Sequence, residues 1–450
     1  MQDLDYEGLA WLSAQNINKI DLGLEDIRWA LKHLNLSELL SGPLPFYCIT
    51  VGGTNGKGSV VALLESCLRA ARFRVGVFTS PHFVSVCERM TIDGQWVSEC
   101  DLNDLVLSYR ERIPEGKLSY FEWVFLLAMG YFVEQKPDVV LLEVGLGGRL
   151  DAVNAVEPDL SIITSIDYDH QQYLGDTLAA IAAEKCGIMR AGKPVVYGGV
   201  HALETVRSQA AERKSLLSTL EDIDVVFGRS ATESVFRFQS STQSSTQLSA
   251  ARTVTGVMPD WVLESNVACA LQALMLLSNT GPKWAKTIDP EVVSLGVKQA
   301  RLKGRLDFQS YQRDFLLDVA HNPAACERLK VYLQQSQQLS KQKGRVVAVF
   351  GVMADKDYKA MLTIMSAAVD AWLLVGLEGE RALPLSDLVT CVQALEGPAV
   401  FKERCLGQCE QSSGVLQWAI SNTSEEDVLV VFGSFHLLGL FYSEMALLKR

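Results

Sequence analysis

The chain has 450 residues, enough for roughly two or three domains. Hydrophobic residues make up 48% of it and charged residues 21%, an ordinary composition for a globular protein with large buried cores. The formal net charge of −12, from 53 acidic and 41 basic residues, argues against nonspecific binding to nucleic acid or to an anionic membrane. An anionic small molecule would have to meet local basic groups.

Ten cysteines are scattered along the chain without a C-x-x-C pair, which indicates free thiols in a reducing compartment. The first residues are acidic and lack the apolar core of a signal peptide. No apolar run reaches the roughly 18 residues that a membrane span needs. We therefore expect a cytoplasmic protein with no membrane partner.

Short β-prone runs alternate with helical patterns in the first half of the chain. This alternation predicts an α/β fold with a mostly parallel sheet covered on both faces. Ligands of such sheets bind beyond the carboxyl ends of the strands. The expected strands are 46–51, 74–78, 139–144, 160–166 and 194–196, and the helices between them include 59–71, 120–135 and 177–189.

The rest of the chain contains two further regions. Residues 222–263 hold short β-like pieces around the tandem Ser-Ser-Thr-Gln repeat at 240–247, which is typical of a polar loop tip. After an apolar helix at 266–278, a second alternating series has strands at 315–319, 346–350, 371–375 and 428–432. We expect a domain over 1–285, a linker over 286–297 and a smaller α/β domain over 298–450.

A glycine-rich segment, Val51-Gly-Gly-Thr-Asn-Gly-Lys-Gly-Ser59, lies between the first expected strand and a helix. Backbone N–H groups and the helix dipole favour anions at such a turn, and Lys57 adds a mobile positive charge. The Ser59 hydroxyl can reach a magnesium ion. The spacing departs from G-x-x-x-x-G-K-[ST] at Val51 and Gly58, which leaves a glycine turn without ligand as the alternative. The strand-then-helix context favours a nucleotide phosphate loop.

Polar residues follow three other strands at the same expected edge. Glu143 ends an apolar strand and precedes a glycine-rich turn, where NTPases place a metal ligand; a capping or solvated glutamate is the alternative. Ser80 and His170 come soon after the neighbouring strands, although a lone histidine is often a core or surface residue. Together these side chains predict a magnesium site. Lys185, judged by its helix alone, reads as a surface lysine.

Two residues of the second half could contact a nucleotide. Asp318 ends the first strand of the expected second domain, where a carboxylate can bind ribose hydroxyls. Arg305 is a plausible phosphate clamp. On spacing alone, either residue could equally belong to a plain turn.

Several ordered motifs resemble the folylpolyglutamate synthase family of the Mur-ligase superfamily. They are Gly53-Thr-Asn-Gly-Lys-Gly-Ser59, Glu143-Val-Gly-Leu-Gly-Gly-Arg-Leu-Asp151, Glu184-Lys185, Asp318-Val-Ala-His-Asn-Pro323, Asp355-Lys-Asp357 and Gly433-Ser-Phe-His436. Asp21-Leu-Gly-Leu-Glu25 and Ser119-Tyr-Phe-Glu122 further resemble the bacterial bifunctional form, dihydrofolate synthase/folylpolyglutamate synthase. The resemblance implies a P-loop domain like the Mur-ligase central domain, followed by one like its C-terminal domain.

The resemblance also implies residue roles. ATP would be held by Thr54, Asn55, Gly56, Lys57, Gly58, Ser59, Asn266, Arg305 and Asp318. Magnesium, expected as two ions, would be held by Ser59, Ser80, Glu143, His170 and a carbamylated Lys185. The pterin would be held by Asp21, Leu22, Gly23, Ser119, Tyr120, Phe121, Leu150, Asp151 and Ala152. The chain departs from the family's usual residues at Phe83 (Leu), Val153 (Thr), Cys186 (Ala) and Lys303 (Pro), and Val153 puts the fine substrate preference in doubt.

The implied activity is ATP-dependent addition of L-glutamate to 7,8-dihydropteroate and to tetrahydrofolate or its polyglutamates, through an acyl phosphate with release of ADP and phosphate. Lys57 and Lys185 would be catalytic, and His321 is a candidate general base. The family favours a monomer whose partners are small molecules. The alternatives are a folylpolyglutamate synthase without the dihydropteroate step, a cell-wall Mur-type amino-acid ligase, and a P-loop switch protein.

Overall fold

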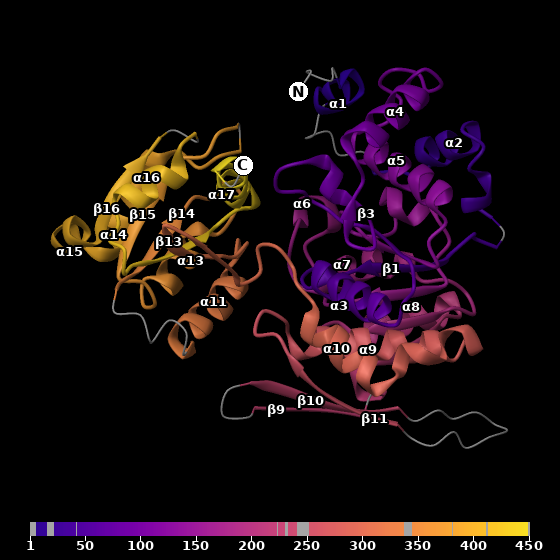
Figure 1. The fold of residues 1–450 in the computed structure, drawn as a ribbon. Helices are drawn as coiled ribbons and strands as arrows, with labels where there is room; N and C mark the ends of the chain where they lie inside the picture. The colour runs from indigo at the N-terminus through magenta and orange to yellow at the C-terminus, as the bar shows by residue number, and fades with distance from the viewer. Residues whose placement is uncertain are drawn as a thin grey trace. The chain divides into compact units, whose positions relative to one another are not determined.

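The computed structural model describes residues 6–15, 22–41, 43–222, 224–229, 233–240, 252–336, 344–379, 381–410 and 413–448. The chain forms two compact units (Figure 1). The first comprises Met1–Pro81 and Val86–Arg301, and the second comprises His82–Ser85 and Leu302–Arg450. In the described parts of the chain, no helix is long and apolar enough to cross a membrane.

An eight-stranded sheet forms the centre of the first unit, in the order β4-β3-β2-β5-β1-β6-β7-β8. Its strands are β1 (Tyr47–Gly52), β2 (Val75–Phe78), β3 (Met90–Ile92), β4 (Gln95–Trp96), β5 (Val139–Glu143), β6 (Leu160–Ile163), β7 (Pro194–Tyr197) and β8 (Leu216–Thr219). The pairings β2–β3 and β3–β4 are antiparallel, and the others are parallel. The predicted mostly parallel α/β sheet is confirmed.

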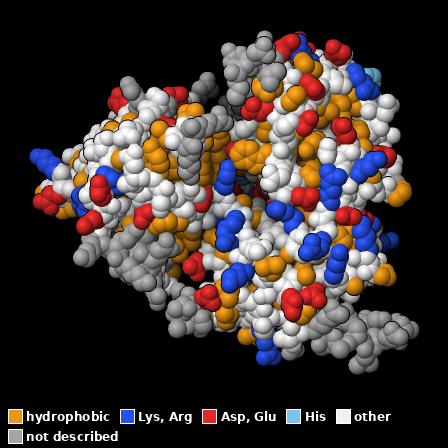
Figure 2. Space-filling model, in the orientation of Figure 1, with side chains coloured by type: hydrophobic (Ala, Val, Ile, Leu, Met, Phe, Trp, Pro, Cys, Tyr) orange, Lys and Arg blue, Asp and Glu red, His pale blue; other side chains and the backbone are white. Residues whose placement is uncertain are grey.

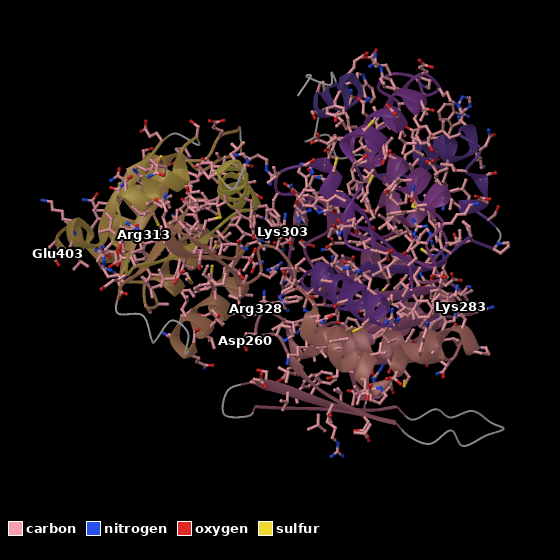
Figure 3. The ribbon with its side chains drawn as sticks, in the orientation of Figure 1. Asp260, Lys283, Lys303, Arg313, Arg328 and Glu403 are labelled. Atoms are coloured by element: carbon pink, nitrogen blue, oxygen red, sulfur yellow. The ribbon has the colours of Figure 1, made fainter. Side chains whose placement is uncertain are left out.

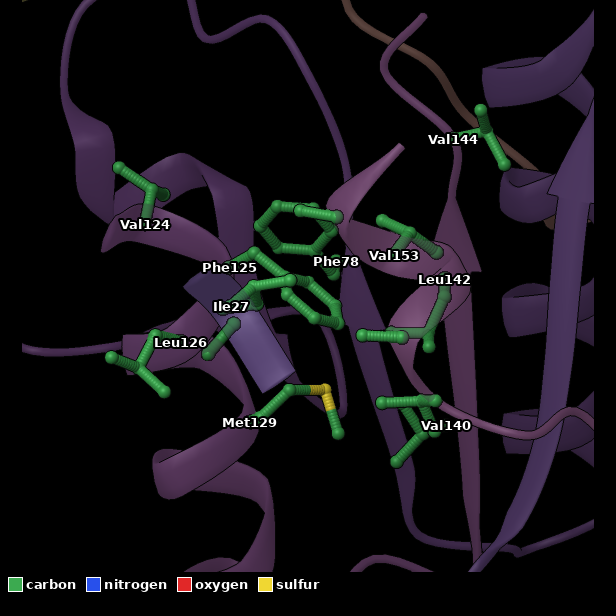
Figure 4. Close-up of a cluster of buried hydrophobic side chains, with 14 of the residues drawn as sticks. Ile27, Phe78, Val124, Phe125, Leu126, Met129, Val140, Leu142, Val144 and Val153 are labelled. Carbon is green, nitrogen blue, oxygen red and sulfur yellow. The ribbon is translucent and has the colours of Figure 1, made fainter. Parts of the chain in front are cut away.

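Helices cover both faces of this sheet (Figure 1). They are α1 (Glu7–Ser13), α2 (Glu25–His33), α3 (Lys57–Ala70), α4 (Glu99–Arg110), α5 (Tyr120–Gln135), α6 (Gln171–Leu174), α7 (Leu178–Lys185), α8 (Leu203–Arg213), α9 (Glu264–Ser278) and α10 (Pro290–Gln299). Val140 and Leu142 of β5 pack with Phe125 and Met129 of α5 in one core (Figure 4). The residue between them, Leu141, packs in the core on the α3 face. A continuous apolar run is thus needed because both faces of the strand are buried.

A small antiparallel sheet, β11-β10-β9, lies beside α10. Its strands are β9 (Asp224–Arg229), β10 (Ser234–Ser240) and β11 (Arg252–Met258). The apolar residues Phe236, Phe238 and Val254 join the core shared with α3, α9 and α10. The predicted β-like pieces are therefore strands, whereas most of the predicted loop tip at 240–247 lies outside the described residues.

The segment 286–297, for which the sequence predicted a linker, forms the end of a 3₁₀ helix (Pro282–Ile288) and most of α10. Gly296 lets α10 approach α3 closely, because a Cβ there would lie 2.5 Å from the Cα of Cys67. Ser66 Oγ also donates to the Gly296 carbonyl at 2.7 Å. This segment therefore packs inside the first unit, which extends to Arg301.

The second unit has a six-stranded sheet in the order β12-β13-β17-β14-β15-β16, parallel except for β12–β13. The strands are β12 (Asp307–Tyr311), β13 (Arg313–Leu317), β14 (Val346–Phe350), β15 (Ala371–Val375), β16 (Cys405–Cys409) and β17 (Val428–Phe432). The helices are α11 (Pro323–Gln335), α13 (Tyr358–Met365), α14 (Leu385–Glu396), α15 (Pro398–Arg404), α16 (Val415–Ser421) and α17 (Phe435–Leu448). Separate apolar cores lie on the two faces of this sheet.

The surface has the mixed character that the composition predicts. Figure 2 shows acidic and basic side chains intermixed over the visible face of the first unit. All ten cysteines are free thiols, and five of them are buried in the two cores of the first unit: Cys48, Cys67, Cys87, Cys186 and Cys269. Their positions fit apolar packing rather than a disulfide framework.

Candidate active site

The glycine-rich segment forms a tight loop between β1 and α3. Gly53 and Gly56 have φ angles of 137° and 91°, which L side chains rarely adopt. A Cβ on Gly56 would lie 2.5 Å from Asn266 Oδ1. Lys57 Nζ donates to the carbonyl oxygens of Gly53 at 3.1 Å and Thr54 at 3.2 Å. The loop has the curvature and the lysine of a phosphate cradle at a helix N-terminus.

The chain that follows β6 holds this loop in place. Ser165 O accepts from the Thr54 N–H at 2.8 Å, and Thr164 Oγ1 donates to Asn55 O at 2.7 Å. Thr54 Oγ1 accepts from Asp167 N at 3.0 Å. His170 was the only residue of this segment that was predicted to belong to the site, so the supporting role of Thr164 and Ser165 was missed. The adjacent hydroxyls of Thr164 and Ser165, directly after a strand, were the available signal.

Asn266 is the predicted ATP residue that the fold brings to the loop from far along the chain. It is buried in the first turn of α9, and its amide lies against Gly56. Gly58 and Ser59 lie in the first turn of α3, next to the loop, and Ser59 is buried. The structure thus collects the predicted ATP residues 54–59 and Asn266 in one place.

Glu143 is buried at the end of β5, opposite Val51 of β1. Its Oε2 accepts from the Ser80 N–H at 3.2 Å, so these two predicted metal ligands are neighbours. The burial rules out the solvated alternative for Glu143. Arg89, which the sequence analysis missed, is also buried; its guanidinium lies 5.4 Å from the Tyr120 ring centre. Burial lowers the pKa of Arg89, while Tyr120 and Glu143 favour its charged form.

Lys185 is buried, with only 4% exposure, so the surface reading taken from its helix alone was wrong. Its Nζ donates to Gly53 O at 3.0 Å, the same carbonyl that Lys57 contacts. Burial, and after it the nearby Lys57 charge, lower the pKa of Lys185 to about 7, against the opposing effect of Asp169 and Asp151. Lys185 therefore has a substantial unprotonated fraction near neutral pH, unlike an exposed lysine.

Burial of Lys185 follows from how the glycine-rich turn after β5 packs on the end of α7. A Cβ on Gly148 would lie 2.9 Å from Glu184 O. Arg149 N donates to that same carbonyl at 2.8 Å, and Arg149 Nη2 pairs with Glu184 Oε1 at 2.8 Å. These partners are far apart in the sequence, which is why the helix pattern alone could not predict them.

His170 directly precedes α6, in the left-handed conformation with φ of 49°, and its side chain is exposed. Its Nε2 lies 3.7 Å from Asp169 Oδ2. Within the described residues, no three His, Cys, Asp or Glu side chains are grouped so as to hold a metal ion. The predicted metal set contains only Glu143 and His170 of those types, so the metal role of this set stays a prediction.

One of the segments predicted for the pterin, residues 119–121, lies at the start of α5. Ser119 caps α5 and bonds Glu122 Oε2 at 2.7 Å, and Tyr120 is buried. The Phe121 ring packs 5.9 Å from that of Phe78 and is partly exposed.

The second pterin segment is a fixed turn. Asp151 is buried, and its carboxylate accepts from Leu146 N at 2.8 Å and Val153 N at 3.0 Å. Burial raises the pKa of Asp151 to about 6 against these hydrogen bonds. Leu150 is partly exposed and Ala152 is buried. Leu22 and Gly23 precede α2, whereas Asp21 lies outside the described residues.

In the second unit, Asp318, which was predicted to bind ATP, lies directly after β13. Asp318 is buried and accepts from Leu306 N at 3.0 Å and Ala320 N at 2.9 Å. Burial raises its pKa, and the Arg305 charge opposes the rise. Arg328 on α11, which is labelled in Figure 3, also interacts electrostatically with Asp318. Arg305 thus interacts electrostatically with Asp318, and contact of either residue with ATP stays a prediction.

His321 lies three residues after Asp318, and its Nδ1 is 2.8 Å from the Val319 carbonyl. Because a carbonyl only accepts, Nδ1 carries the proton of the neutral ring. Nε2 is then the unprotonated ring nitrogen in that tautomer. The geometry is compatible with a base at Nε2.

A phosphate loop at the carboxyl end of a strand in a parallel sheet, with a carboxylate at the end of the adjacent strand, is typical of P-loop nucleotide-binding α/β proteins. The models of two known families match the chain and define its class more narrowly. The Mur ligase middle domain matches residues 51–247, and the Mur ligase, glutamate ligase domain matches residues 304–435.

Individual proteins are similar over almost the whole chain. The dihydrofolate synthase/folylpolyglutamate synthase of Escherichia coli (strain K12) is 34% identical over 433 residues, 95% of this chain and 93% of that protein. The structure of E. coli FolC in complex with DHPP and ADP has a TM-score of 0.79 at 30% identity, covering 99% of this chain and 98% of that one. The bifunctional enzyme of Yersinia pestis complexed with AMPPNP and Mn ion has a TM-score of 0.77 at 33% identity, covering 98% and 97%.

The chain belongs to the dihydrofolate synthase/folylpolyglutamate synthase family of the Mur ligases. It is an ATP-dependent ligase, and the resemblance found in its motifs is confirmed.

Proposed function

We propose that this ligase joins L-glutamate to 7,8-dihydropteroate, giving dihydrofolate, and to tetrahydrofolate or its polyglutamates. ATP would be split to ADP and phosphate through an acyl-phosphate intermediate. The observation that carries the proposal is the convergence of Lys57 and Lys185 on the Gly53 carbonyl, beside the phosphate loop. Its relatives support the substrates, since one is described with DHPP and ADP and another with AMPPNP and Mn ion.

The chemistry explains why a phosphate loop serves amide formation. A carboxylate is a poor acylating agent, because its leaving group would be oxide. The substrate carboxylate would attack the γ-phosphorus of ATP in line, and Lys57 would offset charge on the phosphoryl oxygens. The glutamate amine would then attack the acyl carbon and expel phosphate. Asn266 would contact the nucleotide beside the loop, and Arg305 and Asp318 are also proposed to bind ATP.

The residues present fit magnesium, with two ions proposed. Ser59, Ser80 and Glu143 offer oxygen atoms, which hard cations prefer, and the Ser80–Glu143 contact is already formed. His170 completes the proposed set. Magnesium usually takes few protein carboxylates and relies on substrate phosphates and water for the rest, which agrees with the small number of acidic groups here. When bound, it would supply charge neutralisation at the phosphates.

We propose that Lys185 is carbamylated. Its neutral amine would add to carbon dioxide, forming an N–C bond and releasing one proton, so that a buried cation becomes an anionic oxygen donor. Three features support this: its burial, its contact with Gly53 O, and the nearby Lys57 charge, which a carbamate would pair with. The change would turn a like-charge contact into an attractive one.

The glutamate amine must lose a proton to attack, and His321 Nε2 is proposed to take it. For the pterin, the partly exposed Phe121 and Leu150 are proposed to line the binding surface. The buried groups Ser119, Tyr120, Asp151 and Ala152 would hold those two segments in place. Leu22, Gly23 and Asp21 are proposed to complete the site.

Phosphate release tests the function directly. It should require ATP, glutamate and either dihydropteroate or tetrahydrofolate together. Activity with tetrahydrofolate but never with dihydropteroate would indicate a folylpolyglutamate synthase that lacks the dihydropteroate step. Hydrolysis independent of glutamate would indicate a P-loop switch protein, and use of a cell-wall precursor instead of a pterin would indicate a Mur-type amino-acid ligase. We also propose a cytoplasmic monomer without nucleic-acid or membrane partners; size-exclusion chromatography with light scattering tests the monomer.

A further inference from the structure

One arginine of the first unit, Arg190, bridges two short helices that follow proposed site residues. The 3₁₀ helix Ala152–Ala155 begins directly after Asp151, and the 3₁₀ helix Cys186–Ile188 begins directly after Lys185. The turn that leads into the first of these helices is proposed above to bind the pterin. The spacing of the two helices therefore sets where a pterin acid would lie relative to Lys185.

The Arg190 guanidinium donates hydrogen bonds to both segments at once. Its Nη2 donates to the side-chain Oδ1 of Asn154 at 2.9 Å and to the Asn154 carbonyl at 3.2 Å. Its Nη1 donates to the carbonyls of Gly187 at 3.2 Å and Met189 at 3.3 Å. The planar head of arginine, with five donors, suits this arrangement, which the compact ammonium group of a lysine cannot reproduce.

Asn154 completes this bridge with its own side-chain donor. Its Nδ2 donates to Gly187 O at 3.2 Å, the carbonyl that Arg190 also contacts, and to Arg149 O at 2.9 Å. Arg149 directly precedes the turn at residues 150–152, and Asn154 follows it. The Arg190–Asn154 pair thus holds both ends of the proposed pterin turn against the residues that follow Lys185.

The segment that carries Arg190 is anchored to the central sheet of the first unit. Ser161 Oγ on β6 donates to Ile188 O at 2.8 Å, and Ser215 Oγ, just before β8, donates to Arg190 O at 2.9 Å. The Arg190 side chain is only 17% exposed, and its Nε donates to Glu157. A guanidinium with this many partners is held in one orientation, so the turn that it holds takes its position from the sheet.

We propose that Arg190 is a positioning residue for the pterin acid: by holding Asn154, it keeps the turn at residues 150–152 at the distance from Lys185 that the reaction needs. Arg190 itself contacts no reacting group in this scheme. The inference rests on the proposed function, because it takes residues 150–152 as part of the pterin site. A purely structural arginine would change the stability of the protein without changing the KM for the pterin substrate.

The test measures the KM for dihydropteroate and the KM for ATP separately, by phosphate release on the full chain. We expect Arg190→Gln to raise the KM for dihydropteroate about tenfold and to leave the KM for ATP within about twofold, because small misplacements of a bound substrate are costly. Arg190→Lys keeps the charge but loses the fork of donors, so it should recover only part of the loss. Full recovery would show that the charge matters rather than the bridge, and would overturn the inference.

Arg404→Gln is the matched control, because Arg404 is also an arginine that bonds one glutamate and several backbone carbonyls. Its partners are the Glu396 side chain and the carbonyls of Asp370, Ser366 and Val369. These partners belong to the second unit and include none of the residues proposed for the pterin. Arg404→Gln should lower the melting temperature and leave both KM values unchanged. An equal rise in the KM for dihydropteroate in the two variants would overturn the inference, as would an unchanged KM in Arg190→Gln.

A double-mutant cycle with Asn154→Ala tests whether Arg190 acts through Asn154. The double variant should raise the KM for dihydropteroate by less than the product of the two single effects, since either change removes the Nη2–Oδ1 hydrogen bond. A fully multiplicative rise would overturn the positioning role. An unchanged KM for dihydropteroate in Leu150→Ala would refute the pterin role of the turn, and the inference with it. Failure of the unsubstituted protein to use either dihydropteroate or tetrahydrofolate would instead refute the proposed function itself.

Discussion

The Gly53 carbonyl accepts hydrogen bonds from two lysines, Lys57 at 3.1 Å and Lys185 at 3.0 Å. The position of Lys57 could be predicted because the local motif between a strand and a helix determines it. The burial of Lys185 could not be predicted, because it depends on Gly148 and Arg149. These two residues lie in the turn after β5 and pack against α7. Only the family resemblance indicated that Lys185 was functional.

Replacing Lys57 by alanine should abolish turnover, with kcat at least about 100-fold lower, because one strong charge-stabilising group is removed. Steady-state phosphate release with dihydropteroate, ATP and glutamate measures this. An unchanged melting temperature would show that the fold is intact. Near-normal turnover would contradict the role of Lys57.

Lys185→Ala should be nearly inactive and partly rescued by added formate or acetate, because a small carboxylate can take the place of the carbamate. Activity titrated against the added carboxylate, with chloride as the salt control, measures the rescue. Full activity without any additive would show that the carbamate role is wrong.

At the scale of elements, uniformly apolar strands were predicted well. The strands 346–350, 371–375 and 428–432 were found with the predicted bounds, because burial on both faces leaves no polar positions. The edge strands β8, β12 and β16 were missed because they carry polar or exposed residues. Helix α10 was missed because its close approach to α3 at Gly296 is a long-range contact.

Gly187→Ala tests the contact that buries the end of α7. A Cβ there would lie 2.4 Å from Arg149 Cβ and 2.5 Å from its Cα, so backbone must move. We expect a loss of about 1–3 kcal/mol in the free energy of unfolding, together with reduced activity. Gly281→Ala is the control, because a Cβ there meets nothing within 4 Å. Equal effects of the two substitutions in denaturant unfolding would contradict this packing role.

Asp427 precedes β17 and is hydrogen-bonded to Arg345, which precedes β14. The titration of Asp427 should therefore change the stability of the protein with pH. Its buried carboxylate accepts from Arg345 N at 2.9 Å, Arg345 Nη2 at 2.8 Å and Ser424 N at 2.9 Å. Arg345 and these backbone N–H groups lower the pKa of Asp427 to about 2, against its burial. The stabilisation is therefore present above the unfolded-state pKa near 3.9 and is lost as the pH falls through about 2.

Asp427→Asn should cost about 1–2 kcal/mol at pH 7, because the charge and one acceptor are lost while the exposed Arg345 partner limits the gain. The difference between wild type and variant should shrink as the pH falls from 4 toward 2. Denaturant unfolding at several pH values measures it. A difference that stays constant over that range would contradict the lowered pKa.

At the scale of the whole molecule, the order of the motifs predicted a P-loop domain followed by a Mur-ligase C-terminal domain, and both family matches agree with that order. The course of the chain between the units was not predictable, because the sequence gives no local signal that residues 82–85 pack with residues beyond 302. The aromatic and glycine partners of Phe83 are all distant in sequence.

The central claim is that the enzyme phosphorylates an acid and lets an amino acid displace the phosphate. Dihydropteroate labelled with ¹⁸O in its carboxylate, incubated with ATP and glutamate, tests it when the released phosphate is analysed by mass spectrometry. We predict that one labelled oxygen passes into phosphate for each dihydrofolate formed. Product formation with unlabelled phosphate would contradict the acyl-phosphate route.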